Sequence, residues 1–284
     1  MPYPADILLR GQSLGLSYGR REVSRDLDVD IPLGQISVII GANACGKSTL
    51  LRALSRLLPP SAGQIFLSGR DIRDYGAKAL ARTLAYLPQS ASAPHGITAA
   101  DLVARGRYPH QTLLRQWSEA DDQAVRRAMA QAQVADLADR VVDELSGGQR
   151  QRVWLALVLA QETPVLLLDE PTTYLDVAHQ FEVLELCRTL NRDHGKTLVM
   201  VLHDLNQAAR YADHVIAMRD GAIVAAGAPD DVLTPERIEQ VFGLACMVLR
   251  DPVTGTPLIV PTIGGAGGVG VAPQTVSYSQ EEAS

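Results

Sequence analysis

The segment Gly41-Ala42-Asn43-Ala44-Cys45-Gly46-Lys47-Ser48 decides the fold, because it fits the pattern G-x-x-x-x-G-K-[ST]. It lies between a largely β-branched run, residues 35–40, and a segment with a leucine stripe, residues 47–58. The run is typical of a strand buried on both faces of a mainly parallel sheet, and the stripe is typical of an amphipathic helix. The sequence therefore predicts a strand, a glycine-bounded loop and a helix in direct succession.

The chemistry of this loop indicates that it binds the phosphates of a nucleotide. Glycines allow successive backbone N–H groups to curl around an anion, and the following helix directs its positive end toward it. Lys47 would reach the β- and γ-phosphates, and the Ser48 hydroxyl would complete a Mg²⁺ shell. An accidental glycine-rich turn is the competing interpretation, which the flanking strand and helix make less favoured. The predicted nucleotide-binding positions in this loop are Gly41, Asn43, Ala44, Cys45, Gly46, Lys47, Ser48 and Thr49.

Outside the loop, the hydrophobic pattern predicts an α/β protein. Residues 26–31 alternate strictly, with Leu27, Val29 and Ile31 facing inward, and with residues 7–16 they predict an N-terminal antiparallel β lobe. Short apolar runs then alternate with helical stretches, which is the pattern of a wound, mostly parallel sheet. The runs are residues 165–168, 198–202 and 215–218, and the helical stretches are residues 177–191 and 204–212.

The middle of the chain is predicted to form an inserted helical lobe over about residues 90–162. Ser118 is expected to cap a helix over residues 119–134. We expect one nucleotide-binding domain over residues 5–250 and a C-terminal extension over 251–284. From residue 264 the chain is rich in Gly, Ala and Ser, which predicts disorder.

Composition narrows the functional classes. The chain has 284 residues, a net charge of -6 and 46% hydrophobic residues, which fit a globular protein and disfavour a nucleic-acid-binding one. Its three cysteines have no metal-ligand spacing and indicate reduced cytosolic thiols. The sequence shows no secretory signal and no apolar run near the roughly 18 residues of a membrane helix. We therefore expect another chain to supply any membrane span.

Two carboxylates follow one of the predicted buried strands. The apolar residues 165–168 lead directly into Asp169 and Glu170. Beside a phosphate loop, such a strand end is suited to Mg²⁺ binding by Asp169 and to polarisation of an attacking water by Glu170. An ordinary strand end is the competing interpretation.

A second anion-binding feature is predicted at Leu145-Ser146-Gly147-Gly148-Gln149, ahead of a helix over about residues 149–160. Ser146 alone could be a helix cap. The glycine pair weakens a helix start unless the backbone approaches something closely there.

Residues 145–149 resemble the signature sequence of the ABC ATPases, and the resemblance covers about residues 8–250. Gln89, after Tyr86-Leu87-Pro88, resembles the glutamine of the Q-loop, and residues 173–176 resemble the D-loop, with Tyr174 where a small residue is commoner. His203 matches the switch histidine, and Tyr18 matches the aromatic residue that stacks on adenine. One departure is Ala44, which stands where glycine is more usual. This departure affects the backbone angles of the loop, because alanine tolerates a positive φ poorly.

The resemblance implies an ABC nucleotide-binding domain that uses ATP and Mg²⁺. In that family the signature binds the γ-phosphate of ATP held by the opposite subunit of a head-to-tail dimer. The implied catalytic residues are Glu170, His203 and Gln89. The implied metal-binding residues are Ser48, Gln89 and Asp169. Besides the phosphate loop, the implied nucleotide contacts are Tyr18, Ser146, Gly147, Gly148, Gln149 and Asp176.

A finer resemblance is to the ATPases of ferric-siderophore importers. It is carried by residues 101–110, by Gly69-Arg70-Asp71-Ile72 and by Asp-Glu-Pro-Thr-Thr-Tyr-Leu-Asp at 169–176. It implies an ATPase at the cytoplasmic face of the membrane. The implied partners are a second ATP-binding subunit, which is another copy of this chain or a close relative, permease subunits and, indirectly, an extracytoplasmic substrate-binding protein; nucleic acid is not expected.

Alternatives stay open both for the function and for residues 105–110. Cobalamin and haem importers use closely related ATPases, and a soluble ABC ATPase that remodels nucleic acid or a protein complex is less favoured. Residues 105–110 are either a permease-docking surface or a solvated helix end broken by Pro109.

Overall fold

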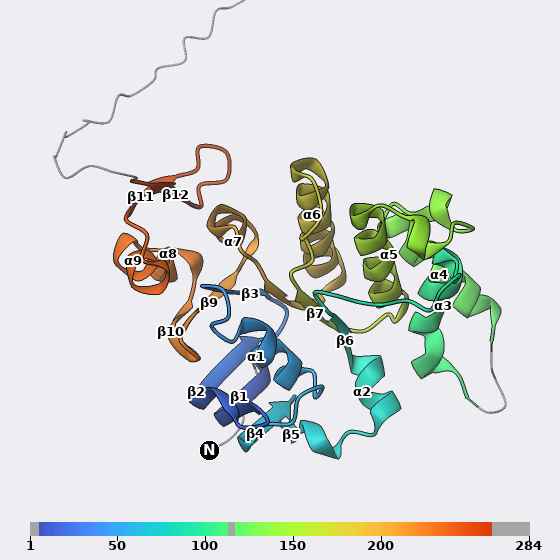
Figure 1. Ribbon diagram of the computed structural model, residues 1–284, viewed down its shortest axis with the longest axis horizontal. Helices are drawn as coiled ribbons and strands as arrows, with labels where there is room; N and C mark the ends of the chain where they lie inside the picture. The colour runs from blue at the N-terminus through green and yellow to red at the C-terminus, as the bar shows by residue number, and fades with distance from the viewer. Residues whose placement is uncertain (1–5, 113–116, 263–284) are drawn as a thin grey trace, which may run out of the picture.

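The computed structural model describes residues 6–112 and 117–262, and its centre is a six-stranded sheet with helices on both faces (Figure 1). The strand order is β10-β9-β3-β8-β7-β6; β9 through β6 run parallel, and only β10 is antiparallel to its neighbour. The strands of this sheet are β3 (Ile36–Gly41), β6 (Leu84–Leu87), β7 (Val165–Asp169), β8 (Thr197–Val201), β9 (His214–Arg219) and β10 (Ala222–Gly227).

The central strands are apolar throughout because they supply two hydrophobic cores. In β3, Val38 and Ile40 belong to one core and Ile39 to the other, as expected when successive side chains point to opposite faces. The first core lies against α5 (Gly147–Ala160), α6 (Val177–His194) and α7 (Leu205–Tyr211). The second lies against α1 (Lys47–Leu54).

The predicted N-terminal antiparallel lobe is present as a four-stranded sheet in the order β2-β1-β4-β5. Leu27, Val29 and Ile31 are buried in it, as their alternation predicts. Leu50 and Leu51 of α1 pack in the same core, so α1 lies between this sheet and the central one. The strands are β1 (Ile7–Tyr18), β2 (Arg21–Pro32), β4 (Ala62–Leu67) and β5 (Arg70–Asp71).

Two helices end earlier than predicted. The helix expected over residues 47–58 stops at Leu54, and Leu57 is 62% exposed. Arg56 has a φ of 61°, and the N–H groups of Leu57 and Leu58 both turn back to the carbonyl of Arg52. A left-handed residue of this kind ends a helix before the prolines are reached.

The helix that follows Ser118 was predicted to reach residue 134, but α4 (Glu119–Gln131) ends three residues sooner. The cause is the same, because Gln133 has a φ of 54°. Ser118 does stand at the N-cap position, although its hydroxyl donates to Asp121 Oδ2 at 2.6 Å instead of accepting a backbone N–H group.

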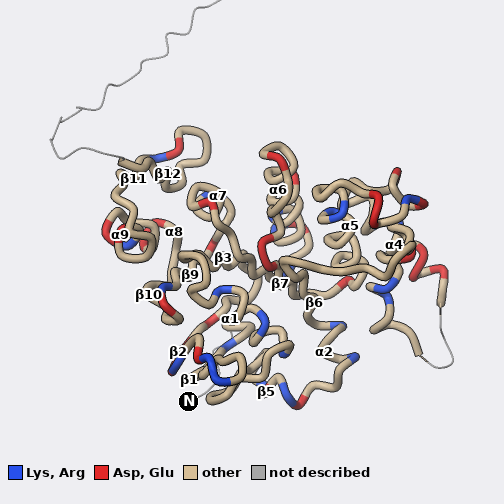
Figure 2. The backbone as a smooth tube through the Cα atoms, viewed as in Figure 1, with Lys and Arg blue, Asp and Glu red and all other residues tan. Residues whose placement is uncertain are grey.

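Most of the helical lobe lies beside the α/β core (Figure 1) and carries both acidic and basic residues (Figure 2). It contains α3 (Ala99–Ala104), the 3₁₀ segment Arg105–His110, α4 and α5. The remaining helices are α2 (Ala77–Thr83), α8 (Pro229–Val232) and α9 (Pro235–Phe242), and further single 3₁₀ turns cover Ile72–Asp74, Ala135–Leu137 and Val142–Glu144.

The segment Arg105–His110 is only in part a solvated helix end. Arg107 is 5% exposed, donates to Asp121 Oδ1 at 2.9 Å and Glu162 Oε2 at 2.8 Å, and reaches the Ala160 carbonyl at 2.7 Å. The solvated interpretation is therefore wrong for Arg107, because its charge is fully engaged at the end of α5. It holds for Tyr108, which is 65% exposed.

The C-terminal extension begins as a β-hairpin of β11 (Cys246–Arg250) and β12 (Pro257–Pro261). Asn206 of α7 fixes it through two hydrogen bonds to the backbone of Ile259. The boundary placed at residue 250 falls at the turn of this hairpin, and the predicted disordered tail lies outside the described residues. Across residues 6–112 and 117–262, every helix is too short or too polar to cross a bilayer.

Candidate nucleotide-binding site

The loop from Gly41 to Gly46 joins β3 to α1, and its backbone has unusual φ angles at Gly41 and Ala44. Gly41 has a φ of 153°, and a Cβ there would lie 2.3 Å from the carbonyl oxygen of Met218, so the neighbouring strand excludes any side chain. Ala44 has a φ of 61°, in the left-handed region, and this angle is strained for alanine.

Lys47 closes over this loop at the first position of α1. Lys47 is 5% exposed, and its Nζ donates to the carbonyls of Gly41 at 2.8 Å and Ala42 at 2.9 Å. The ammonium group is therefore held at the mouth of the loop. The first N–H groups of α1 lie at the same place, because the N-terminal N–H groups of a helix have no partner within it.

Ser48 and Asp169 meet although 121 residues separate them. Ser48 Oγ donates to Asp169 Oδ1 at 2.8 Å, and Tyr86 Oη donates to Asp169 Oδ2 at 3.2 Å. Burial raises the pKa of Asp169, which is 0% exposed, while these two hydroxyls oppose the rise. Burial and the neighbouring Asp169 charge raise the pKa of Tyr86 to about 12, so Tyr86 stays a hydrogen-bond donor.

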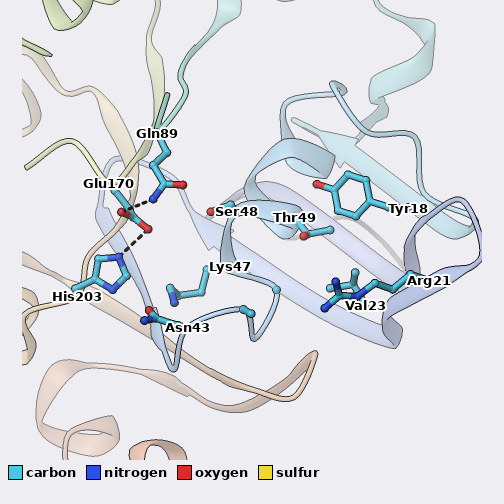
Figure 3. Close-up of a pocket in the computed structure, with 12 residues that line it drawn as sticks. Tyr18, Arg21, Val23, Asn43, Lys47, Ser48, Thr49, Gln89, Glu170 and His203 are labelled. Carbon is cyan, nitrogen blue, oxygen red and sulfur yellow. Dashed lines mark hydrogen bonds and ion pairs between the residues drawn. The ribbon is translucent and has the colours of Figure 1, made fainter. Parts of the chain in front are cut away.

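Glu170 is the centre of a polar cluster made by three loops (Figure 3). Its Oε2 accepts hydrogen bonds from Gln89 Nε2 at 2.8 Å and Thr173 Oγ1 at 3.0 Å, and its Oε1 lies 2.7 Å from His203 Nε2. Glu170 has a φ of 54°, a strained angle that is common at functional loops. The cluster brings together all three predicted catalytic residues.

A cavity of about 670 Å³ extends from this cluster to the N-terminal lobe. In Figure 3, Glu170, Gln89 and His203 lie at one end of it, Tyr18 lies at the other, and Ser48 and Thr49 lie between. The predicted residues that line it are Tyr18, Asn43, Ala44, Gly46, Lys47, Ser48, Thr49, Gln89, Glu170 and His203. Gly41 and the buried Cys45 shape the loop without lining the cavity.

The structure places the predicted signature residues at a different cavity, of about 390 Å³. Ser146 caps α5 in a reciprocal arrangement: its hydroxyl accepts the Gln149 N–H group at 3.2 Å, and Gln149 Oε1 accepts the Ser146 N–H group at 3.1 Å. Gly147, Gly148 and Asp176 line the same cavity. One chain therefore presents two predicted phosphate-binding features that do not share a cavity.

The close approach that the glycine pair implied is an approach to the loop of residues 173–176. A Cβ on Gly147 would lie 3.4 Å from Tyr174 Cβ, and one on Gly148 would lie 3.1 Å from Leu175 Cδ2. Asp176 accepts a hydrogen bond from the His179 N–H group at 3.0 Å, and so it caps α6 as well as lining the cavity.

Five residues at the site were not predicted. Arg21 and Val23 line the large cavity, and Tyr18 pairs with Arg21 across the β1–β2 turn, so a hairpin reading of residues 7–31 could have found them. Thr173 contacts Glu170, and Tyr86 contacts Asp169. Arg52, which donates to Tyr18 Oη at 3.3 Å, lies one helical turn after Ser48. Thr173 and Tyr86 lie in segments that resemble family motifs, but no sequence pattern assigns a site role to them or to Arg52.

The donor atoms fit Mg²⁺. Ser48 Oγ and Asp169 Oδ1 are hard oxygen atoms 2.8 Å apart beside the phosphate loop. Mg²⁺ usually takes few protein ligands and completes its octahedron with waters and phosphate oxygens. Gln89, the third predicted metal-binding residue, lines the 670 Å³ cavity together with Ser48, whereas Asp169 lies behind Ser48 and does not line it.

Comparison with known proteins places the chain in a family. The ABC transporter family model matches residues 24–173. The ferric enterobactin transport ATP-binding protein FepC of Escherichia coli (strain K12) is 56% identical, over 89% of this chain and 93% of that protein. The probable siderophore transport system ATP-binding protein YusV of Bacillus subtilis (strain 168) is 52% identical, over 88% and 91%.

Two further matches are less similar. A cobalamin import ATP-binding protein of Halobacterium salinarum is 44% identical, over 83% of this chain and 59% of that protein. Among solved structures, an inward-facing putative metal-chelate type ABC transporter matches with a TM-score of 0.77 and 29% identity, over 90% of this chain and 98% of that chain. The α/β core, the helical lobe and these similarities agree: the chain belongs to the ABC transporter family of ATP-binding proteins.

Proposed function

We propose that this protein binds and hydrolyses ATP to energise the import of ferric siderophores through a separate permease. The observation that carries the proposal is the separation of two phosphate-binding features. Lys47 and Ser48 line one cavity, and Ser146, Gly147 and Gly148 line another. Two head-to-tail copies would bring the second feature of each chain onto the nucleotide held by the first feature of the other.

At the nucleotide site around Lys47 and Ser48, the residues have distinct tasks. Lys47 and the loop N–H groups hold the phosphates, and Tyr18 stacks on the adenine. Mg²⁺, held by Ser48, Asp169 and Gln89, would neutralise charge that develops on the transferred phosphoryl group. Glu170 accepts a proton from the attacking water, and His203, 2.7 Å from Glu170, contacts the γ-phosphate.

ATP can shift the transporter from one conformation to another only if it binds the second conformation more tightly than the first. Closure of two chains on two ATP molecules would favour one permease conformation, and hydrolysis would reopen the pair. The protein would lie at the cytoplasmic face of the membrane, together with permease subunits and, indirectly, an extracytoplasmic substrate-binding protein. The division into a nucleotide-binding domain, residues 5–250, and a C-terminal extension is part of this proposal.

The cargo assignment rests on the relatives. Those named for ferric enterobactin and siderophores are 56% and 52% identical over nine-tenths of this chain, whereas the one named for cobalamin is 44% identical. Cobalamin import is therefore the second candidate.

Uptake measurements test the proposal. The gene would be deleted in its own host, and uptake of labelled ferric siderophore, cobalamin and haem would be measured. We expect loss of ferric-siderophore uptake alone, with recovery by the wild-type gene and none by Glu170→Gln. Loss of cobalamin uptake alone would support the second candidate instead.

Co-purification tests the broader class. Gentle extraction of membranes should recover the protein with polytopic subunits. Recovery only in a soluble complex with nucleic acid or other proteins would contradict a role in transport.

A further inference from the structure

The carboxylate of Asp169 is held on both of its oxygens. Ser48 Oγ donates to one at 2.8 Å and Tyr86 Oη to the other at 3.2 Å. Tyr86 can reach this position because β6 and β7 are parallel neighbours, and Leu87 pairs with Leu168 just before Asp169. Ser48 belongs to the loop that is predicted to bind the nucleotide, whereas Tyr86 lies on β6, outside that loop.

Arg52 interacts with both Tyr86 and Tyr18. It lies four residues after Ser48, on the same side of α1. Its Nη1 donates to Tyr18 Oη at 3.3 Å. The positive charge of Arg52 also acts on Tyr86, where it opposes the rise that burial causes in the pKa of that hydroxyl. Among the described residues, Arg52 is the only hydrogen-bond partner found for the Tyr18 side chain, whose residue is 43% exposed.

Two hydrogen bonds, from Arg52 to Tyr18 and from Tyr86 to Asp169, are linked by the electrostatic interaction of Arg52 with Tyr86. We call these four side chains the polar path. The path leads from Tyr18, which lines the cavity, to Asp169, whose hydrogen-bond partner Ser48 also lines it. The positive charge of Arg52 also acts on Asp169, since it opposes the effect of burial on that carboxylate. A path along which each side chain restrains the next gives two distant groups a common set of preferred positions.

We propose that Arg52 and Tyr86 are positioning residues that couple the base-stacking Tyr18 to the metal-binding Asp169. The inference rests on the proposed function, because it takes ATP and Mg²⁺ as the ligands of this cavity. Tyr86 fixes the orientation of the carboxylate toward the metal, and Arg52 fixes Tyr86 and the Tyr18 ring together. Coupling of this kind is reciprocal, so adenine stacking and metal binding strengthen one another.

The experiment measures metal binding directly. Mn²⁺, which accepts the same oxygen ligands as Mg²⁺, is titrated by electron paramagnetic resonance into the full-length protein with saturating ATP. Tyr86→Phe removes one hydroxyl, and we expect Mn²⁺ affinity to fall about tenfold, as is usual when a partner of a metal ligand is lost. Tyr75→Phe is the matched control, because its hydroxyl bonds to the Leu67 carbonyl, outside the path.

Tyr18→Phe gives the decisive result. It keeps the ring that stacks on adenine and removes only the hydroxyl that Arg52 holds. We expect Mn²⁺ affinity to fall about fivefold, although the changed atom is remote from the metal. The double variant Tyr18→Phe/Tyr86→Phe should lose no more than Tyr86→Phe alone, because both changes break one path. Arg52→Gln should behave like Tyr18→Phe.

Unchanged Mn²⁺ affinity in Tyr86→Phe, or losses that add in the double variant, would overturn the coupling. Lys47→Ala separates this outcome from failure of the proposed function. If Lys47→Ala binds ATP like the wild type, the nucleotide site itself is misplaced. If it does not bind ATP and the path variants match the wild type, only the coupling is refuted.

Discussion

Gln89 Nε2 donates a hydrogen bond to Glu170 Oε2 at 2.8 Å, which joins the ends of two neighbouring parallel strands. His203 follows the next strand, β8, and the phosphate loop follows β3, beside β8. The functional residues therefore follow the carboxyl ends of four adjacent strands, which is where ligands of such sheets bind.

Replacement of Glu170 by glutamine should stop hydrolysis without preventing ATP binding. A general base contributes about 10²- to 10⁴-fold, so turnover should fall at least about 100-fold. The variant should accumulate as a dimer when ATP is added, measured by size-exclusion chromatography. Glu182→Gln changes an exposed glutamate of α6 and is the control. Near-normal steady-state hydrolysis by Glu170→Gln would refute the role of this carboxylate.

Replacement of Lys47 by alanine should abolish ATP binding, since it removes the cation held over the loop by the carbonyls of Gly41 and Ala42. Isothermal titration calorimetry measures the affinity directly. Lys78→Ala, on the exposed surface of α2, should bind ATP like the wild type. The phosphate role fails if the affinities of the two variants are equal.

Ala44→Gly should stabilise the protein. The φ of 61° costs alanine about 1–2 kcal/mol, which exceeds the conformational entropy that glycine loses on folding. We expect the free energy of unfolding to rise by about 1 kcal/mol in denaturant titrations. Ala130→Gly, on the exposed face of α4, should instead lower it by about 1 kcal/mol. A loss of stability in Ala44→Gly would contradict the assignment of strain.

Arg107→Met should destabilise the helical lobe strongly. The change leaves the buried Asp121 carboxylate without its cation, and breaking such a pair costs about 3–5 kcal/mol. Arg127→Met removes an exposed partner of Glu162 and should cost no more than about 1 kcal/mol. Equal unfolding free energies of the two variants would show that burial of Arg107 is unimportant.

The same pair should make stability depend on pH in the acid range. Burial would raise the pKa of Asp121, but Ser118 and Arg107 together lower it below its ordinary value of about 3.9. The charged carboxylate therefore stabilises the fold above about pH 4, and this contribution is lost as the pH falls through the lower, folded pKa.

The unfolding free energies of wild type and Asp121→Asn, compared at pH 6 and at pH 3, measure this contribution. The difference between the two proteins should shrink at pH 3. Asp136→Asn, at an exposed position, is the control and should show no such change. A difference that stays constant with pH would contradict the linkage.

Local chemistry let the sequence alone determine much of this protein. The loop from Gly41 to Ser48 predicted a strand, a phosphate loop and a helix, and the alternation at Leu27, Val29 and Ile31 predicted the buried face of β2. These features depend on residue type and spacing, which the sequence displays. The helix ends at Leu54 and Gln131 were not predicted. Each helix ends because Arg56 or Gln133 adopts a left-handed conformation, and neither residue is the glycine or proline that usually indicates a helix end.

The tertiary structure alone decided which distant residues meet. The order of the parallel strands brings Gln89, Glu170 and His203 together, and it brings Tyr86 to Asp169 across 83 residues. Arg107 was expected either in solvent or on a docking surface, but α4 and the end of α5 enclose it. Burial and pairing of this kind depend on how the elements pack, and no local pattern records it.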